Sequence, residues 1–402
     1  MTDGRMALRT GHARLGSVAR YAMVAGVVGL VLFAIGVTIE PRRALAAYVF
    51  GYATVFTIVI GALIQVMLSH VTGARWFTVL RRLTLDVTGA VPILALLAIP
   101  FLAGVRVLYP WADPAALPPD VRALIARKAA WLNVPFFVAR SAVYLVAWIA
   151  VAWSLRRAAR AQDHALGETA VRATRRLRRS SAIGLVVVAL TLTFAAFDWL
   201  MSLEPTWYST IYGVYVFAGG YLAALALVAV VGYVGSRGIA AEGGTVTSEH
   251  FGALGQLLLT FVIFWAYIAF AQFLIIWIGD IPREVTWYAV RARGGWGVLA
   301  LIVGIGQFAI PFVLLLSRNL KRHPAFLAGL AAWLLAMHVL EVYWLVLPAI
   351  DPAGVSVSWV DVAALLMIGG FAMAAACWRA RRDPSLPLGD PYLARALRYV
   401  EP

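Results

Sequence analysis

The sequence contains very few residues that bind redox metals. Cys377 is its only cysteine, and six histidines are present among 402 residues. One thiol cannot hold an iron–sulfur cluster, and no Cys-x-x-Cys-His sequence is present for attaching haem c. The histidines expected in loops or at the ends of apolar runs are His12, His70, His164, His250 and His323, which leaves only His338 at membrane depth. We therefore expect the chain to bind no cofactor with its own ligands, so any redox centre would belong to a partner.

Charged residues are scarce as well, at 13% of the chain against 62% hydrophobic residues. Such a composition is typical of a polytopic membrane protein and excludes a large soluble catalytic domain. No Gly-rich phosphate loop ending in Gly-Lys-Ser or Gly-Lys-Thr occurs. Apolar runs of about 20 residues, long enough to cross a bilayer as helices, recur along the chain. They cover residues 18–38, 46–69, 87–109, 131–153, 181–201, 210–234, 251–278, 296–317, 325–348 and 357–378. The sequence thus predicts an all-α membrane protein of ten helices, with one integral membrane domain over residues 1–402.

Positive charge sets the expected orientation, because Lys and Arg accumulate on the cytoplasmic side of membrane helices. Residues 154–180 are rich in arginine, so we expect a basic cytoplasmic loop there. Alternation then places both termini, and a tail at residues 379–402, in the cytoplasm. The basic residues left outside are Arg42, Arg43, Arg106, Arg122, Arg127, Lys128, Arg283, Arg291 and Arg293. This asymmetry explains most of the net charge of +15, so no nucleic acid need be invoked, although anionic lipid headgroups or an acidic partner would fit the basic loop.

Ionisable residues within apolar runs are candidates for function, because burying them in a bilayer is costly. In "MHVLEVYW" (Met337 to Trp344), His338 and Glu341 are three residues apart and share one helix face. A histidine and a carboxylate within reach of each other can pass a proton. The alternative is a static hydrogen-bonded pair that holds two helices together.

Further polar residues lie near the ends of the runs. Arg140 lies in the fourth run and Asp198 at the outer end of the fifth, and we expect these two to form an ion pair. Glu204 lies in the short external turn after Asp198, where it suits docking of an external subunit or proton release. Asp86 opens the third run on the inner side. Glutamines at positions 65, 256, 272 and 307 are scattered through other runs, and the sequence does not show whether they face one cavity.

Three motifs resemble one known family. They are "FDWLMSLEPTWYSTIYGVYVFAGG" (Phe197 to Gly220), "FWAYIAFAQFLIIWIGDIPREVTWY" (Phe264 to Tyr288) and "HVLEVYWLVLP" (His338 to Pro348). They resemble the ActF subunits of bacterial alternative complex III, a quinol:cytochrome c oxidoreductase, within the NrfD-like, polysulfide-reductase membrane-subunit superfamily. This chain has Glu341 where the family usually has aspartate, which keeps a carboxylate. It has Thr206 where the family usually has histidine, which removes a titratable group from the turn.

The resemblance implies an architecture and a set of partners. The architecture is two four-helix bundles, helices two to five (about 46–201) and six to nine (about 210–348), flanked by the first and last helices. The implied partners are a homologous NrfD-like membrane subunit, an external iron–sulfur subunit, haem c subunits and small membrane subunits. These partners would carry the haem c and iron–sulfur clusters, and the complex would lie in the bacterial inner membrane.

The expected function is a membrane subunit that anchors external redox subunits of a quinol-oxidising complex and is not catalytic alone. A quinone pocket and a proton path are the further roles open to it. His338 and Glu341 would form the proton relay, with Asp86 as an inner entrance. Asp198, Arg140 and Glu204 would lie toward the outer face. The alternatives are a secondary transporter that uses buried ionisable residues and a purely structural membrane anchor.

Overall fold

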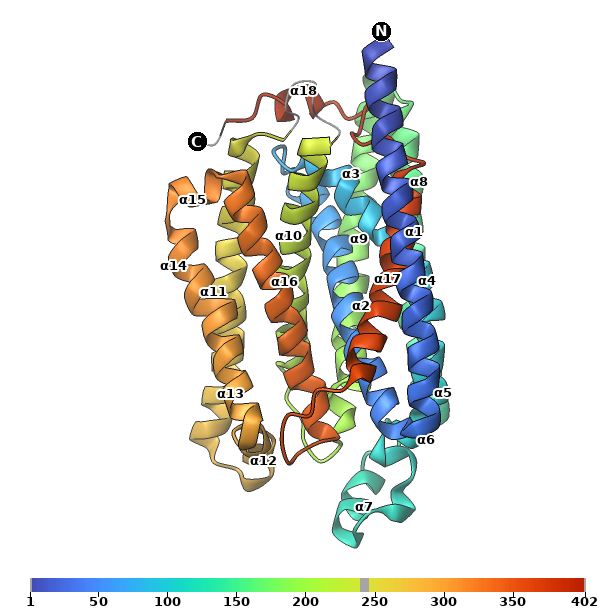
Figure 1. Cartoon of the computed structure of the whole chain (residues 1–402), viewed down its shortest axis with the longest axis vertical. Coiled ribbons are helices and arrows are strands. Elements are labelled where there is room, and N and C mark those ends of the chain that lie inside the picture. The colour runs from blue at the N-terminus through green and yellow to red at the C-terminus, as the bar shows by residue number, and fades with distance from the viewer. Residues whose placement is uncertain (1, 239–245, 401–402) are drawn as a thin grey trace.

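The computed structural model describes residues 2–238 and 246–400, and every regular element in these ranges is a helix. Ten helices are long and apolar enough to cross a membrane, which confirms the all-α polytopic class (Figure 1). In chain order the spans are α1 (Thr2–Ile39); α2 (Pro41–Val71); α3 (Thr78–Val87) continued by η1 (Thr88–Ala90), α4 (Val91–Leu96) and α5 (Ile99–Ala103); α8 (Val134–Asp163); α9 (Gly167–Trp199); α10 (Tyr212–Gly238); α11 (Ser248–Gly279); α13 (Gly294–Val303) continued by the π-helical η5 (Gly304–Ala309) and α14 (Ile310–Leu316); α16 (Pro324–Val346); and α17 (Trp359–Ala380). The shorter helices are α6 (Val105–Leu108), η2 (Pro110–Ala112), η3 (Pro114–Ala116), α7 (Pro119–Ala126), η4 (Met201–Leu203), α12 (Pro282–Arg291), α15 (Arg318–Arg322), η6 (Leu347–Ala349) and α18 (Leu393–Ala396).

Two boundaries differ from the prediction for the same physical reason. The third span begins at Thr78 and not near residue 87, and residues 154–180 form the ends of α8 and α9 and not a loop. Only residues 164–166 connect those two helices. The polar side chains that suggested loops are accommodated in helices because Arg82 pairs with Asp163 and Arg160 pairs with Asp383.

Local sequence signals set several helix starts. Proline, whose missing N–H is harmless in the first turn, begins α2 (Pro41), α12 (Pro282) and α16 (Pro324). The side chain of Asn133 accepts a hydrogen bond from Phe136 N at 3.0 Å and caps α8. The cap satisfies a backbone donor that would otherwise be unpaired, and each proline removes one.

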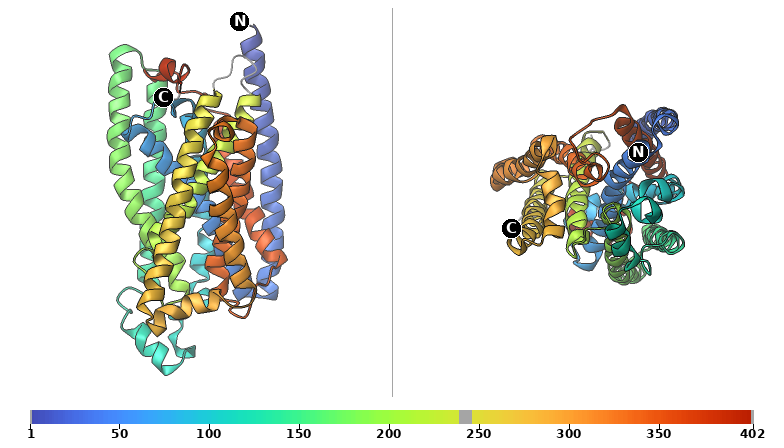
Figure 2. Two further views of the ribbon diagram at one scale, coloured as in Figure 1. Left: turned by 90° about the vertical axis from the view of Figure 1, so that its left-hand side faces the viewer. Right: turned by 90° about the horizontal axis from the view of Figure 1, so that it is seen from below.

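The centre of the molecule is the pair α2 and α10. In α2, 89% of the most apolar stretch is buried, and in α10 72%, against 28% in α1 and α11, whose outer faces are left for lipid. The view along the helices in Figure 2 places α2 and α10 among the other spans. The two helices approach closely at Gly61 and Gly220, where a Cβ added to Gly61 would lie 2.8 Å from Gly220 O. Small residues at such crossings are typical of helix packing in membranes. The grouping into two four-helix bundles stays a prediction.

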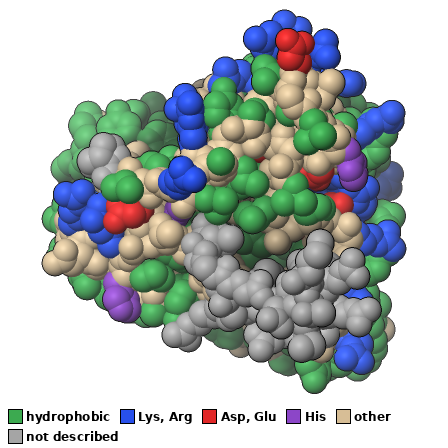
Figure 3. All heavy atoms as spheres, turned by 90° about the horizontal axis from the view of Figure 1, so that it is seen from above, with side chains coloured by type: hydrophobic (Ala, Val, Ile, Leu, Met, Phe, Trp, Pro, Cys, Tyr) green, Lys and Arg blue, Asp and Glu red, His purple; other side chains and the backbone are tan. Residues whose placement is uncertain are grey.

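The two ends of the helix array differ in character. We call the end with residues 72–77, 164–166, 317–323 and 381–400 the proximal end, and the end with residues 104–133, 200–211, 280–293 and 350–358 the distal end (Figure 1). The start of α1 and the last described residues both lie at the proximal end, where Lys and Arg side chains gather (Figure 3). Exposed arginines of α9 contribute there, namely Arg172, Arg175, Arg176, Arg178 and Arg179. The cytoplasmic position of this end stays a prediction.

A prediction follows from the packing of α1 on α17. A Cβ added at Gly29 would lie 2.4 Å from the backbone N of Met367, whereas one added at Gly329 on α16 would meet no atom within 4 Å. Gly29→Ala is therefore expected to lower the free energy of unfolding by about 1–3 kcal/mol, as overpacking does. Gly329→Ala, the matched control, should be neutral or stabilising by about 0.5 kcal/mol. Unfolding in detergent, followed by tryptophan fluorescence, measures both, and equal effects would contradict the close α1–α17 contact.

Candidate functional site

His338 and Glu341 on α16 form a buried pair of titratable side chains within the spans. Their side chains are 3% and 1% exposed, and His338 Nδ1 lies 3.0 Å from Glu341 Oε2. The predicted sharing of one helix face is therefore confirmed. Two titratable groups in direct contact inside a bilayer can hold a proton between them.

Side chains from two other spans hold the Glu341 carboxylate. Trp265 on α11 donates its Nε1–H to Oε1 at 2.6 Å, and Gln307 on η5 donates from Nε2 to Oε2 at 2.9 Å. Gly219 of α10 allows this approach, because a Cβ there would lie 2.5 Å from both carboxylate oxygens. Of the glutamines noted in the sequence, Gln307 is thus the one that joins this site. The carboxylate lies where four helices meet.

Thr57 of α2 completes the site on the other side of His338. Its hydroxyl donates to Ala53 O at 2.7 Å and lies 3.0 Å from His338 Nε2. With the hydroxyl hydrogen on Ala53 O, Thr57 accepts a hydrogen bond from a protonated Nε2. With the hydroxyl turned to Nε2, the ring needs no proton there, and the His338–Glu341 pair holds one proton fewer. Rotation of one hydroxyl therefore gives a hydrogen-bonded arrangement for either protonation state.

Hydrogen-bonding side chains continue from Glu341 toward the distal end. Tyr215 of α10 lies beside Glu341 and Trp265. Beyond it, Gln272 of α11 donates to the Tyr288 hydroxyl at 3.1 Å and accepts from Ser209 at 3.1 Å. Burial raises the pKa of Tyr288 to about 12, so its phenol keeps its proton at neutral pH. These groups form a polar series between the site and the distal surface.

Toward the proximal end the series is interrupted. The next polar side chain on the same face of α2 is Gln65, which accepts a hydrogen bond from Tyr221. Gln65 is two helical turns from Thr57, or about 12 Å along the axis. The tight contact of Gly61 with Gly220 fills the intervening level. The His338–Glu341 pair is therefore better connected to the distal end than to the proximal end.

Asp86 belongs to a separate ionic cluster at the proximal end. It lies within α3, near Arg156 and Asp383, and is 6% exposed. Asp383 accepts a hydrogen bond from Arg160 at 2.8 Å, and Asp390 accepts one from Arg81 at 2.6 Å, so the C-terminal segment is tied to this cluster. Within the described ranges, no hydrogen bond or ion pair joins Asp86 to the His338–Glu341 pair. The sequence placed Asp86 at the mouth of a span, whereas the helix already starts at Thr78.

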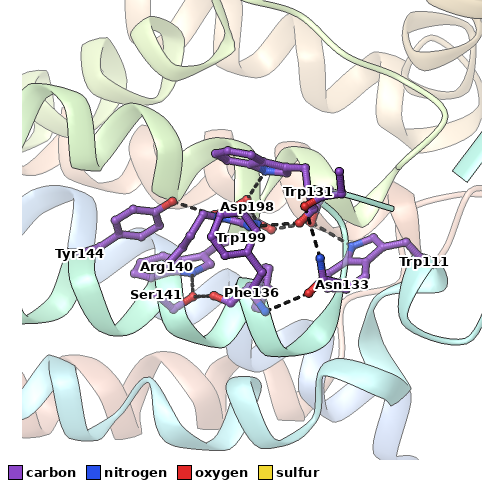
Figure 4. A network of polar contacts seen from close by, with 12 residues as sticks. Trp111, Trp131, Asn133, Phe136, Arg140, Ser141, Tyr144, Asp198 and Trp199 are labelled. Carbon is purple, nitrogen blue, oxygen red and sulfur yellow. Dashed lines mark hydrogen bonds and ion pairs between the residues drawn. The ribbon is translucent and has the colours of Figure 1, made fainter. Parts of the chain in front are cut away.

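The expected ion pair of Arg140 with Asp198 is confirmed (Figure 4), and the two side chains are 8% and 0% exposed. Arg140 donates from Nε and Nη2 to the two carboxylate oxygens, both at 2.8 Å. Trp131 Nε1 and the Tyr144 hydroxyl donate to the same carboxylate at 2.9 and 2.8 Å. The guanidinium also lies 4.0 Å from the centre of the Trp131 ring and 4.2 Å from that of Phe136. With four donors on Asp198, this geometry suits a packing role better than proton transfer.

Glu204 has a partner that the sequence did not predict. It accepts a hydrogen bond of 2.6 Å from Arg291, which is 1% exposed and was expected outside the membrane. The guanidinium lies 3.6 Å from the centre of the Trp287 ring, and Trp287 stacks on Trp207 at 4.5 Å. Trp287 and Arg291 follow Pro282 and are four residues apart, so they lie on one face of a short amphipathic helix. This spacing is the sequence signal that could have indicated the position of Arg291.

Two ion pairs thus hold the chain in place around the turn after α9. Arg140 holds Asp198 against α8, and Arg291 holds Glu204 against α12 and the end of α16. Lys128 adds a hydrogen bond to Pro205 O at 2.7 Å, and burial together with the nearby Arg283 lowers the pKa of this lysine. Asp198 at the end of α9 and Glu204 in the turn therefore have a structural explanation.

In residues 2–238 and 246–400, no group of three or more His, Cys, Asp or Glu side chains is placed to hold a metal ion. No family model matches the chain, and no curated protein sequence matches it. The family resemblance therefore rests on the three sequence motifs, and the site on the geometry of His338 and Glu341.

Proposed function

We propose that this chain is the membrane subunit of a quinol:cytochrome c (or equivalent acceptor) oxidoreductase of the alternative complex III type, in which His338 and Glu341 bind and pass on a proton. The observation that carries the proton role is the enclosed His338–Glu341 contact of 3.0 Å, with Trp265, Gln307 and Thr57 around it. The three motifs support the identity of the complex. A homologous NrfD-like subunit, an external iron–sulfur subunit, haem c subunits and small membrane subunits are the proposed partners, in the bacterial inner membrane with both termini cytoplasmic.

Quinol oxidation releases protons together with electrons, which gives titratable groups near such a site a physical purpose. Glu341 would accept a proton from the quinol, and Trp265 and Gln307 would hold its carboxylate in a fixed orientation. His338 would share that proton, and Thr57 would adjust its hydroxyl to either charge state. Tyr215 and Ser209, whose hydroxyls can pass on a proton, would lead it toward the distal surface, and Gln272 would hold Ser209 and Tyr288 by hydrogen bonds. The electrons would pass through the haem c and iron–sulfur centres of the partners.

One observation fits a hydroxyl ligand such as a quinol at this site. Gln307 Oε1 is buried and has no hydrogen-bond partner in the structure, although the other end of the same amide donates to Glu341. A buried acceptor without a donor is costly, so a hydroxyl group or water there would be stabilising. A quinol, whose hydroxyl can donate to Oε1, is the ligand that the proposed complex would supply.

A secondary transporter is the second candidate, because two spans are interrupted. The third span is broken by η1 and the turns before and after α5, and the eighth contains η5. Transporters place substrates at paired broken helices. Here the third span packs on α2 and α17, whereas the eighth packs on α11 and α16. The two interruptions therefore do not build one shared site, which favours the oxidoreductase over the transporter.

Isolation from native membranes tests the proposed complex. After mild cross-linking in the membrane, affinity capture of this chain is expected to bring down haem c polypeptides and an iron–sulfur subunit. The reduced preparation should then show the visible absorption of haem c. Capture from membranes lacking the tagged chain is the control. A colourless, uncross-linked chain that takes up a solute in proteoliposomes would instead support the transporter.

A further inference from the structure

The backbone of the eighth span leaves one carbonyl without a partner in its own helix. Ile310 N–H donates to Ile305 O, five residues back, which is the π-helical pattern. In an α-helix the same N–H would reach Gly306 O. The next residue, Pro311, has no N–H and cannot serve Gly306 O in the π-helical pattern either. Gly306 O therefore needs a donor from another helix.

Trp333 of α16 supplies that donor. Its Nε1–H donates to Gly306 O at 2.7 Å, while its indole is 42% exposed at the outer surface. Gly306 permits the contact, since a Cβ there would lie 2.3 Å from Met337 Sδ and 3.3 Å from Trp333 Cζ2. An unsatisfied carbonyl inside a bilayer costs several kcal/mol. This hydrogen bond thus stabilises the π-helical register against the α-helical one.

The helical register of η5 determines the direction of the next side chain, that of Gln307. Gln307 is 1% exposed and reaches Glu341 through Nε2, while its Oε1 has no partner that would hold the amide from the other side. Its direction therefore depends on the backbone. A shift by one residue turns a side chain by about 100° around the helix axis, which would take Gln307 away from Glu341.

We propose that Trp333 is a positioning residue, whose hydrogen bond to Gly306 holds η5 in the register that directs Gln307 to Glu341. Its importance for proton transfer rests on the proposed function of the His338–Glu341 pair. The positioning itself does not, and it can be measured on the carboxylate of Glu341.

Infrared spectroscopy of the purified complex tests the positioning. The carboxyl signal that disappears in Glu341→Gln identifies Glu341, and its conversion from carboxylate to carboxyl is followed as the pH is lowered. In Trp333→Phe the midpoint is expected to move up by about one pH unit, a tenfold change in proton affinity, because the carboxylate loses a hydrogen-bond donor. Gln307→Leu removes this donor altogether, so its midpoint gives the largest shift that loss of the hydrogen bond can cause. Trp277→Phe, at an indole that is 65% exposed on α11, should leave the midpoint unchanged.

Pro311→Ala is the second variant, and it changes the backbone hydrogen bonding of the π-helical segment and not the side chain of Trp333. An N–H at position 311 gives the α-helical register a complete set of backbone donors, so the span can return to the generally preferred α-helix, and the same upward move is expected without touching Trp333. Unchanged midpoints in folded Trp333→Phe and Pro311→Ala, with a moved midpoint in Gln307→Leu, would overturn the proposal. A moved midpoint with unchanged quinol turnover would uphold the positioning and contradict the proposed proton role.

Discussion

Replacement of Glu341 by Gln is expected to lower quinol-dependent turnover by about a hundredfold, the lower end of what a positioned proton-transfer group contributes. The variant keeps the size of the side chain, and its amide can still accept from Trp265 Nε1 and donate to His338 Nδ1. Gln307 can rotate its unpartnered Oε1 toward the new amide. The fold should therefore survive, while the proposed proton transfer through Glu341 is lost. Turnover and proton release in membranes are the measurements.

Glu168→Gln is the matched control for that experiment. Glu168 makes the same chemical change possible at an exposed position in the first turn of α9. Its turnover should equal that of the parent. If Glu341→Gln releases protons and turns over as the parent does, the pair is a static contact and the chain is an anchor for its partners.

Replacement of Asp198 by Asn is expected to cost about 3–5 kcal/mol in the free energy of unfolding, because Arg140 is left buried without its counter-ion. The carboxylate is completely buried and accepts both Arg140 bonds at 2.8 Å. Asparagine keeps the shape but turns a donor toward the guanidinium. Denaturant titration in detergent measures the loss, with tryptophan fluorescence as the signal.

Tyr144→Phe serves as the graded control at the same carboxylate. It removes one neutral donor, the hydroxyl at 2.8 Å from Asp198 Oδ2, and leaves the ion pair in place. We expect a loss of roughly 1–2 kcal/mol. If the ion pair has a packing role, Tyr144→Phe should lower the free energy of unfolding less than Asp198→Asn does. A stable Asp198→Asn variant with slowed turnover would place Asp198 in the proton path.

Several features of the site follow from sequence alone, because they depend on spacing along one helix. The contact of His338 with Glu341 is one, since residues three apart share a helix face whatever surrounds them. The Arg140–Asp198 pair could also be predicted, because a charge within a span needs a partner and the adjacent span offers a carboxylate. The partnership of Arg291 with Glu204 could not, since it joins segments that are 87 residues apart.

The amino-acid sequence by itself determined the class of this protein and the number of its spans, because apolar length and the cost of unpaired backbone groups in lipid permit only helices. It also placed His338, Glu341 and Arg140 inside the spans. Tertiary structure alone decided which of them meet. Thr57, Trp265 and Gln307 come from three different spans, and only the packing of α2, α11 and η5 on α16 brings them to His338 and Glu341. The direction of Gln307 depends further on a π-helical register that Pro311 and Trp333 impose together, and no periodicity in the sequence encodes that contact.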